Sequence, residues 1–175
     1  MDVFEKTIDN KNIYKGKIIT LDLETVLLPN KKTADREIVR HPGAVAIIPV
    51  DESGNIYFVK QFRKAINSEL LEIPAGKLER GEEPSECALR ELQEEIGYRA
   101  DKPTFITEIY TSPGFADEKI YIFKAEDLIK SELAKDDDEF INIYRHKPDE
   151  VFEMIKKREI TDAKTIVALM TAFKL

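Results

Sequence analysis

The sequence has 175 residues, of which 42% are hydrophobic and 35% are charged, and its net charge at neutral pH is −7. This length suits one compact domain with a small appendage and excludes two full domains. The acidic balance argues against broad nucleic-acid binding, because that function needs a basic face. An anionic substrate must therefore be held by a local group of arginines or by a metal ion.

Cysteine and histidine are too few for several kinds of site. The single cysteine, Cys87, excludes an intrachain disulfide and a cysteine zinc cluster. His41 and His146 lie far apart in the sequence, which argues against a histidine metal site. The amino terminus lacks a signal-peptide hydrophobic run, and the longest apolar stretch, residues 44–50, is too short to cross a bilayer. We expect a soluble, cytoplasmic protein.

The first forty residues predict a small antiparallel sheet. Residues 17–28 alternate apolar and polar side chains, as a strand with one buried face does. A turn at residues 29–35 leads into a second strand at residues 36–41. A sheet of this size is too small to be stable alone. We therefore treat residues 1–41 as a separate piece and residues 42–175 as the main domain.

The middle of the chain predicts further strands and then its best helix. Residues 44–50 and 55–62 have the pattern of a hairpin joined at the sequence DESG, and residues 69–73 could add a strand. Residues 82–96 favour a helix, since Pro84 suits a first turn and Gly97 a C-terminal stop.

The remainder mixes strands and helices. Strands are predicted at residues 104–111, 119–126 and 140–146, and helices after Pro148 and from residue 161 or 162 to about Phe173. This order indicates an α/β layered fold with a β-rich amino-terminal piece.

Three glutamates of the predicted helix, Glu91, Glu94 and Glu95, are related as i, i+3 and i+4, so their side chains converge on one patch. Acids this close repel one another unless they share a cation, and Mg²⁺ is suited to carboxylate and carbonyl oxygens. The alternative is a solvated helix with ordinary salt bridges, because Arg90 is four residues from both Glu86 and Glu94.

The surrounding pattern favours the metal. From Gly76 the chain reads GKLERGEEPSECALRELQEEIGY, which resembles the Nudix box. Chance agreement at its fixed positions is on the order of 10⁻⁹ per window. The matching residues are Gly76, Glu82, Arg90, Glu91, Leu92, Glu94, Glu95 and Gly97, while Tyr98 stands where an aliphatic residue is usual.

The resemblance implies a Nudix α/β/α sandwich with a mixed sheet, a small N-terminal antiparallel β-sheet, and Mg²⁺-dependent hydrolysis of nucleoside diphosphates linked to another group. Mn²⁺ is the alternative metal. The family pattern makes Glu91 and Glu95 metal ligands, with Glu94 beside them and the carbonyl of Ala75 as a further oxygen. By the same pattern, Glu82 supports the metal shell through water, and Arg90 orients the acids as part of the catalytic set.

Segments outside the box resemble the ADP-ribose pyrophosphatase branch of the Nudix hydrolases. Pro113 lies fifteen residues past Tyr98, as the proline of that branch does, and the likeness covers roughly residues 13–172. The branch then implies phosphate-binding roles for Arg36 and Arg63, for which exposed strand-end charges are the alternative. Other substrate-binding positions that the branch suggests are Pro113, Glu118, Arg40 and Tyr14.

An acidic run, residues 136–139, precedes the predicted strand at residues 140–146. Such runs are usually solvated loops. In the resembled branch, an acidic loop at this place supplies the base that activates water, which makes Glu139 the favoured catalytic base and Asp137 the alternative.

The leading expectation is therefore hydrolysis of ADP-ribose to AMP and ribose 5-phosphate. The alternatives are hydrolysis of other ADP-sugars or of nucleoside triphosphates, and a non-catalytic module that binds a nucleotide sugar and regulates a partner. Relatives exchange the amino-terminal piece across a two-fold axis, so we expect a domain-swapped homodimer, with residues 1–41 serving dimerisation and substrate binding. No nucleic-acid or membrane partner is expected.

Overall fold

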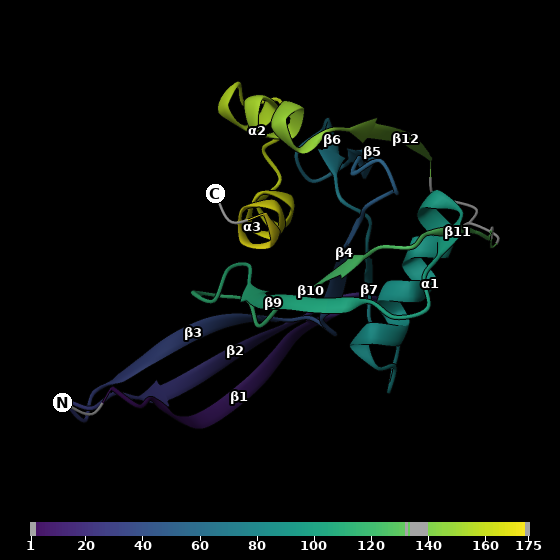
Figure 1. Cartoon of the computed structure of the whole chain (residues 1–175). Helices are drawn as coiled ribbons and strands as arrows, with labels where there is room; N and C mark the ends of the chain where they lie inside the picture. Colours follow the sequence, from purple (N-terminus) through teal and green to yellow (C-terminus); the bar gives the residue numbers. More distant parts are fainter. Residues whose placement is uncertain (1–2, 132, 134–139, 174–175) are drawn as a thin grey trace. The chain divides into compact units, whose positions relative to one another are not determined.

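A computed structural model describes residues 3–131, 133 and 140–173 of the chain (Figure 1). These residues form two compact units: the described residues within 1–43 and 110–119 belong to one, and those within 44–109 and 120–175 belong to the other. Among the described residues no helix is long and apolar enough to span a membrane.

The first unit contains one antiparallel sheet with the order β1-β2-β3. Its strands are β1 (Lys6–Lys15), β2 (Thr20–Leu27) and β3 (Thr33–Arg40). Strand β1 is exposed along its whole length, while β2 buries Glu24 and Val26. The sequence predicted β2 and β3 but not β1, because the segment KTIDNKNIYK is polar and has no buried face.

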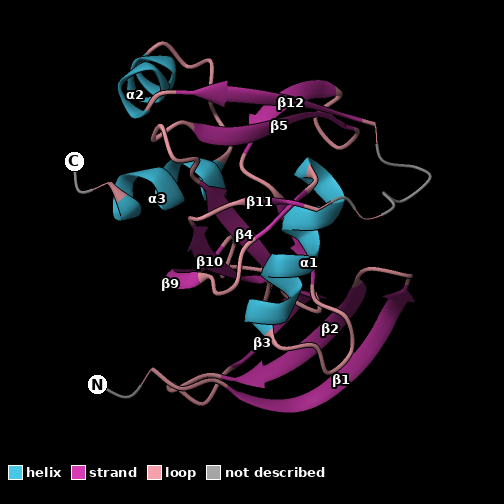
Figure 2. Cartoon of the chain, turned by 45° about the vertical axis from the view of Figure 1, so that its right-hand side comes forward, coloured by secondary structure: helices cyan, strands magenta, loops and turns pink. Residues whose placement is uncertain are grey.

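Among the described residues, the second unit contains three helices and the remaining strands (Figure 2). Its largest sheet has the order β7-β4-β10-β9, a second sheet has the order β12-β5-β6, and β8 pairs with β11. The strands are β4 (Ala44–Pro49), β5 (Ile56–Arg63), β6 (Ser68–Glu72), β7 (Ala75–Lys77), β8 (Tyr98–Arg99), β9 (Thr104–Tyr110), β10 (Lys119–Ala125), β11 (Ile129–Lys130) and β12 (Ile141–His146). The helices are α1 (Pro84–Ile96), α2 (Pro148–Lys156) and α3 (Ala163–Ala172).

The expected hairpin between β4 and β5 is wrong. The two strands belong to different sheets, and only an isolated bridge joins Val50 to Ile56. Instead, β4 pairs in parallel with β10 and antiparallel with β7. Strand β4 pairs in this way because it is a central strand covered on both faces, and all six of its residues are buried.

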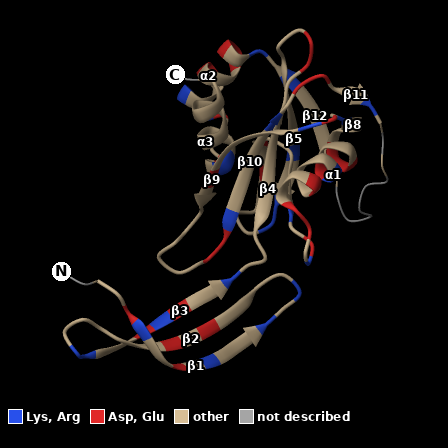
Figure 3. Ribbon diagram, turned by 60° about the horizontal axis from the view of Figure 1, so that its bottom comes forward, with Lys and Arg blue, Asp and Glu red and all other residues tan. Residues whose placement is uncertain are grey.

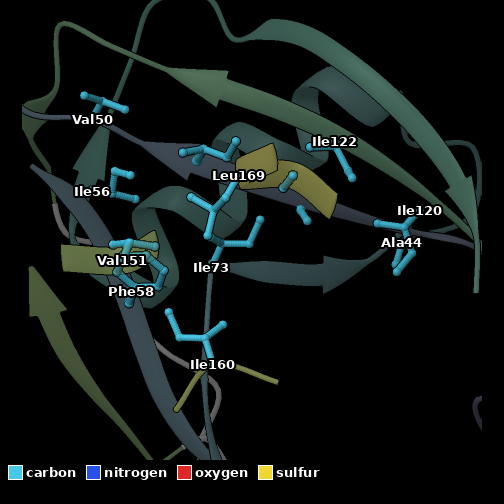
Figure 4. Packing of buried hydrophobic residues seen from close by; sticks show 13 residues of the cluster. Ala44, Val50, Ile56, Phe58, Ile73, Ile120, Ile122, Val151, Ile160 and Leu169 are labelled. Atoms are coloured by element: carbon cyan, nitrogen blue, oxygen red, sulfur yellow. The ribbon is translucent and has the colours of Figure 1, made fainter. Parts of the chain in front are cut away.

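Strand β4 separates two hydrophobic clusters. Ala44, Ala46 and Ile48 face a cluster that includes residues of α2 and α3 (Figure 4), while Val45 and Ile47 face a cluster that includes residues of α1. Successive side chains of a strand point to opposite faces, so one strand supplies both cores. This arrangement, with helices on both sides of a mixed sheet and a separate small antiparallel sheet, confirms the expected fold class.

Helix α1 depends on the second of these clusters for its stability. Leu92 is fully buried there, and replacing it with alanine removes packed methyl groups and leaves a cavity. We predict that Leu92→Ala lowers the free energy of unfolding by about 2–5 kcal/mol, measured by urea denaturation. Met170→Ala, at an exposed position of α3, is the control. A loss no larger than that of the control would contradict the packing described.

Candidate active site

Helix α1 holds most of the candidate acids, and its ends are well defined. Pro84 occupies the first turn, where its missing N–H costs nothing. Gly97 closes the helix in the left-handed conformation, with φ of 76°, and its N–H bonds back to the carbonyl of Gln93. Glycine adopts this backbone at a lower cost than other residues, because it has no Cβ. Acidic positions run along the helix in Figure 3.

Arg90 is the centre of the acidic group. Its Nε donates to Oε1 of Glu82 at 2.9 Å, and its Nη1 donates to Oε1 of Glu91 at 2.7 Å and to Oε2 of Glu94 at 2.8 Å. Its Nη2 also reaches Glu82 and the carbonyl of Lys77. One guanidinium therefore gathers three of the predicted acids. The alternative of ordinary exposed salt bridges predicted the pair with Glu94 but not these other contacts.

This network shifts the pKa values of its members. Hydrogen bonding from Arg90 lowers the pKa of Glu82 to about 2, and hydrogen bonding to Glu82 raises the pKa of Arg90. Burial raises the pKa of the Cys87 thiol, which lies 3.2 Å from Nη2 of Arg90. The acid and the arginine are thus both charged at neutral pH, whereas Cys87 is a neutral packing residue.

The two expected carboxylate ligands, Glu91 and Glu95, lie against the main chain at the start of the box. A Cβ built on Gly76 would come 1.8 Å from Oε1 of Glu91, so only glycine allows that carboxylate to lie where it does. The N–H of Ala75 donates to Oε2 of Glu95 at 2.9 Å. Glu91 and Glu95 are both buried, at 7% and 2% exposure.

These residues suit a divalent cation chemically. Carboxylates and a main-chain carbonyl are hard oxygen donors, which Mg²⁺ and Mn²⁺ prefer. Within the part of the chain that the structure describes, no three acidic, histidine or cysteine side chains are close enough together to hold a metal ion. Mg²⁺ usually takes one or two carboxylates and completes its shell with water and substrate phosphates, so the two observations are compatible.

Arg63 lies at the end of β5 and is held by a buried acid. Its Nε and Nη2 donate to the two carboxylate oxygens of Glu72, each at 2.7 Å. The side chain of Glu72 is 1% exposed, whereas that of Arg63 is 41% exposed. The arginine is therefore fixed at one end and accessible at the other. Glu72 could not be singled out from the sequence, because a glutamate in a short strand such as SELLE resembles an ordinary exposed strand residue.

In the first unit, Arg36 and Arg40 are both paired with acids. Arg36 makes a two-pronged contact with Glu5 at 2.9 and 2.7 Å. Arg40 contacts Glu24, and its Nη1 donates to Asp117 at 3.2 Å. Arg36 is thus engaged at the surface, and Arg40 links β2 and β3 to the loop at residues 111–118.

That loop contains Pro113 and Glu118. It lies along β3, with an N–H to carbonyl bond of 2.7 Å from Val39 to Phe115. Glu118 accepts a hydrogen bond of 2.7 Å from the hydroxyl of Thr111. Oε1 of Glu118 lies 3.7 Å from Nδ1 of His41. Because that nitrogen accepts the N–H of Gly43, it does not donate a hydrogen bond to Glu118.

Two sets of predicted residues remain to be placed. Tyr14, at the end of β1, is exposed and its ring lies over Gly16, where a Cβ would come within 2.7 Å of the ring. The predicted bases, Asp137 and Glu139, lie outside the described residues.

Comparison with known proteins gives the family. The NUDIX domain pattern matches residues 39–169, which include the whole box and both hydrophobic clusters. The chain belongs to the NUDIX family. This Nudix protein is 50% identical to the ADP-ribose pyrophosphatase of Bacillus subtilis (strain 168) over 167 residues, which cover 94% of this chain and 90% of the relative.

Two further comparisons bear on this Nudix protein. It is 46% identical to the methanol dehydrogenase activator of Bacillus methanolicus, again over 94% of this chain and 90% of the relative. Its fold matches a crystal structure of an ADP compounds hydrolase with a TM-score of 0.87 and 20% identity, covering 97% of this chain and 92% of the other.

The contact between Glu82 and Arg90 predicts a pH dependence of stability. Because the pKa of Glu82 falls from 4.5 to about 2 on folding, its ionised form stabilises the fold above pH 4.5, and this contribution disappears as the pH falls toward 2. We expect Glu82→Gln to cost at most about 3 kcal/mol at pH 7 and clearly less at pH 3, measured by urea unfolding.

The control is Glu86→Gln, at an exposed glutamate in the first turn of the same helix. A cost of Glu82→Gln that stays constant from pH 7 to pH 3 would show that the ionic contact with Arg90 does not stabilise the fold.

Proposed function

We propose that this protein hydrolyses ADP-ribose to AMP and ribose 5-phosphate in the presence of Mg²⁺. The observation that carries the proposal is the group of box acids around Arg90, in a chain that is half identical to an ADP-ribose pyrophosphatase. In this reaction water attacks one phosphorus of the diphosphate, the P–O–P bond breaks, and each product keeps one phosphate.

The box residues have separate roles in this proposal. Glu91 and Glu95, with the carbonyl of Ala75, hold the cation, and Glu94 and Glu82 complete its surroundings directly or through water. When bound, a divalent cation neutralises phosphate oxygens and lowers the pKa of water. Arg90 keeps Glu82, Glu91 and Glu94 together before a metal arrives, which offsets their mutual repulsion.

The substrate residues follow from the chemistry of an ADP-sugar. Arg63 and Arg36 bind the diphosphate, since a guanidinium makes paired bonds to phosphate oxygens. Glu118 and Pro113 meet the terminal sugar, and Tyr14 is the candidate for the adenine. Glu139 is proposed as the base that activates water, with Asp137 as the alternative. The single cysteine supports a cytoplasmic location.

A panel of substrates tests the proposal. We expect AMP to be released from ADP-ribose faster than from other ADP-sugars, and chelation of the metal to abolish release. Faster hydrolysis of another ADP-sugar or of nucleoside triphosphates would contradict ADP-ribose as the preferred substrate. It would leave the metal-dependent hydrolysis of a diphosphate bond unaffected.

A second candidate is a regulatory module. The 46% identity to a methanol dehydrogenase activator favours it, because that name describes an effect on another protein. Binding of ADP-ribose without turnover of any compound of the panel would support the module and contradict the hydrolase.

The metal ligands give the first functional prediction. Glu95→Gln removes a ligand charge while keeping the size of the side chain, so the cation and its neutralising effect are both weakened. We predict that kcat falls at least about 100-fold with the circular dichroism unchanged. The control is Glu86→Gln on the same helix. Near-normal kcat of Glu95→Gln at saturating Mg²⁺ would refute the assignment of this ligand.

The arginine and the loop glutamate should affect specificity differently. Arg63→Ala should lower kcat/KM similarly for ADP-ribose and for other ADP-sugars, because all share the diphosphate. Glu118→Ala should narrow the difference between these substrates, because a site built to bond a hydroxyl disfavours ligands that lack it. Both variants are measured on both substrates. An unchanged preference in Glu118→Ala would show that this loop does not select the sugar.

We also propose a homodimer formed through the amino-terminal sheet, with residues of that sheet serving the partner's active site. The sheet and the segments next to it expose several large apolar side chains to water: Val3, Phe4, Ile8, Ile13 and Ile18. Light scattering should give about twice the mass of 20.1 kDa. An active species of monomer mass would contradict this assembly.

A further inference from the structure

Four charged side chains in the second unit form an ionic cluster, which we name the Glu72 cluster, and the carboxylate of Glu95 adds an electrostatic interaction with its member Arg63. Arg63 binds both oxygens of Glu72, each at 2.7 Å. Lys164, in the first turn of α3, contacts Oε2 of Glu72 and donates to Oδ2 of Asp162 at 3.0 Å. The cluster holds two positive and two negative charges, so it is formally neutral.

Burial within the cluster decreases from Glu72 at its centre to Arg63 at its edge. The side chains of Glu72, Lys164, Asp162 and Arg63 are 1%, 10%, 15% and 41% exposed. Burial alone would raise the pKa of Glu72, but bonds from Arg63 and the charge of Lys164 outweigh it, and the pKa lies below its ordinary value. A buried carboxylate of this kind must stay paired. Arg63 is the member that reaches solvent.

The same residues attach α3 to the strand that carries Glu72. Asp162 caps α3 by accepting the N–H of Thr165 at 3.0 Å and its hydroxyl at 2.6 Å. The hydroxyl oxygen of Thr165 accepts the N–H of Ile73, the neighbour of Glu72, at 2.9 Å. The position of Lys164 relative to Glu72 is therefore fixed by the bond between their neighbours, Thr165 and Ile73.

We propose that Lys164 is a positioning residue for the diphosphate: it fixes Glu72, and Glu72 fixes the guanidinium of Arg63 for the substrate. This inference rests on the proposed function, which makes Arg63 a diphosphate ligand. Lys164 acts in two ways. First, Lys164 contacts Oε2 of Glu72 and so helps to hold this carboxylate in the orientation that binds Arg63 through two bonds. Second, its positive charge balances the carboxylate of Asp162, so that the four members of the cluster together carry no net negative charge that would repel an anion at Arg63.

A purely structural role for Lys164 predicts a different result. If the Glu72 cluster only stabilises the fold, removing either Lys164 or Asp162 lowers the stability and leaves substrate affinity unchanged in the folded fraction. If the cluster positions and balances Arg63, the two changes act oppositely on anion affinity. Lys164→Met leaves the Glu72 cluster, with Arg63 included, at a net charge of −1, whereas Asp162→Asn leaves it at +1. Asparagine can still cap α3.

The experiment compares Lys164→Met, Asp162→Asn and their combination with the wild type. The kcat and KM are measured on the diphosphate compound that the wild type hydrolyses best, and ADP binding is measured by calorimetry. We expect Lys164→Met to raise KM and the Kd for ADP about tenfold, with kcat changed less than about threefold. Asp162→Asn should not weaken ADP binding, and the double variant should bind ADP nearly as the wild type does.

The control is Lys156→Met on α2, where the lysine is exposed and pairs only with the neighbouring Glu153 among the contacts of the described residues. Arg63→Ala provides a second comparison: in its background, Lys164→Met should cause a clearly smaller loss of ADP affinity than it does in the wild type. Additive losses, unchanged ADP affinity in a less stable Lys164→Met, or weaker ADP binding by Asp162→Asn would each overturn the inference. The comparison of ADP binding between Asp162→Asn and the wild type tests the inference even if Lys164→Met does not fold.

The two proposals can fail separately. If the wild type binds ADP but does not hydrolyse ADP-ribose, the proposed function fails, and the calorimetry still decides the role of Lys164. If the wild type hydrolyses ADP-ribose but Lys164→Met leaves KM and the Kd for ADP unchanged, only the inference about Lys164 fails.

Discussion

The ionic group around Arg90 is the interaction on which the rest of the candidate site depends. Glutamates placed within one or two turns of a helix repel one another, and here a single guanidinium bonds to Glu82, Glu91 and Glu94. Because the opposite side of α1 packs through Leu92 into the core, the helix can hold these acids at fixed positions. The acids can thus be assembled as the chain folds, before any metal is bound.

The surrounding fold supplies two further constraints of the same kind. Gly76 leaves room for the carboxylate of Glu91, so the short strand β7 and the helix α1 approach each other directly at the site. Elsewhere in the second unit, Glu72 is buried and fixes Arg63. In both places a buried carboxylate is paired with an arginine, which makes its position specific even where its net contribution to stability is small.

The sequence predicted what local patterns encode. The box, with its spacing from Gly76 to Gly97, identified the family, and helix α1 begins only two residues later than predicted. Long-range pairing was not accessible: β4 and β5 look like a hairpin because both are apolar and a turn joins them, yet they lie in different sheets. For the same reason the contact of Lys164 with Glu72, 92 residues apart in sequence, could not be anticipated.

The location of the divalent cation tests the central claim most directly. Crystals of the wild type grown with Mn²⁺ would show the metal by its anomalous scattering. The account predicts a peak bonded to the carboxylates of Glu91 and Glu95 and the carbonyl of Ala75, with Arg90 still bonded to Glu82. A peak bonded to none of these acids, or an Arg90 turned away from them, would contradict it.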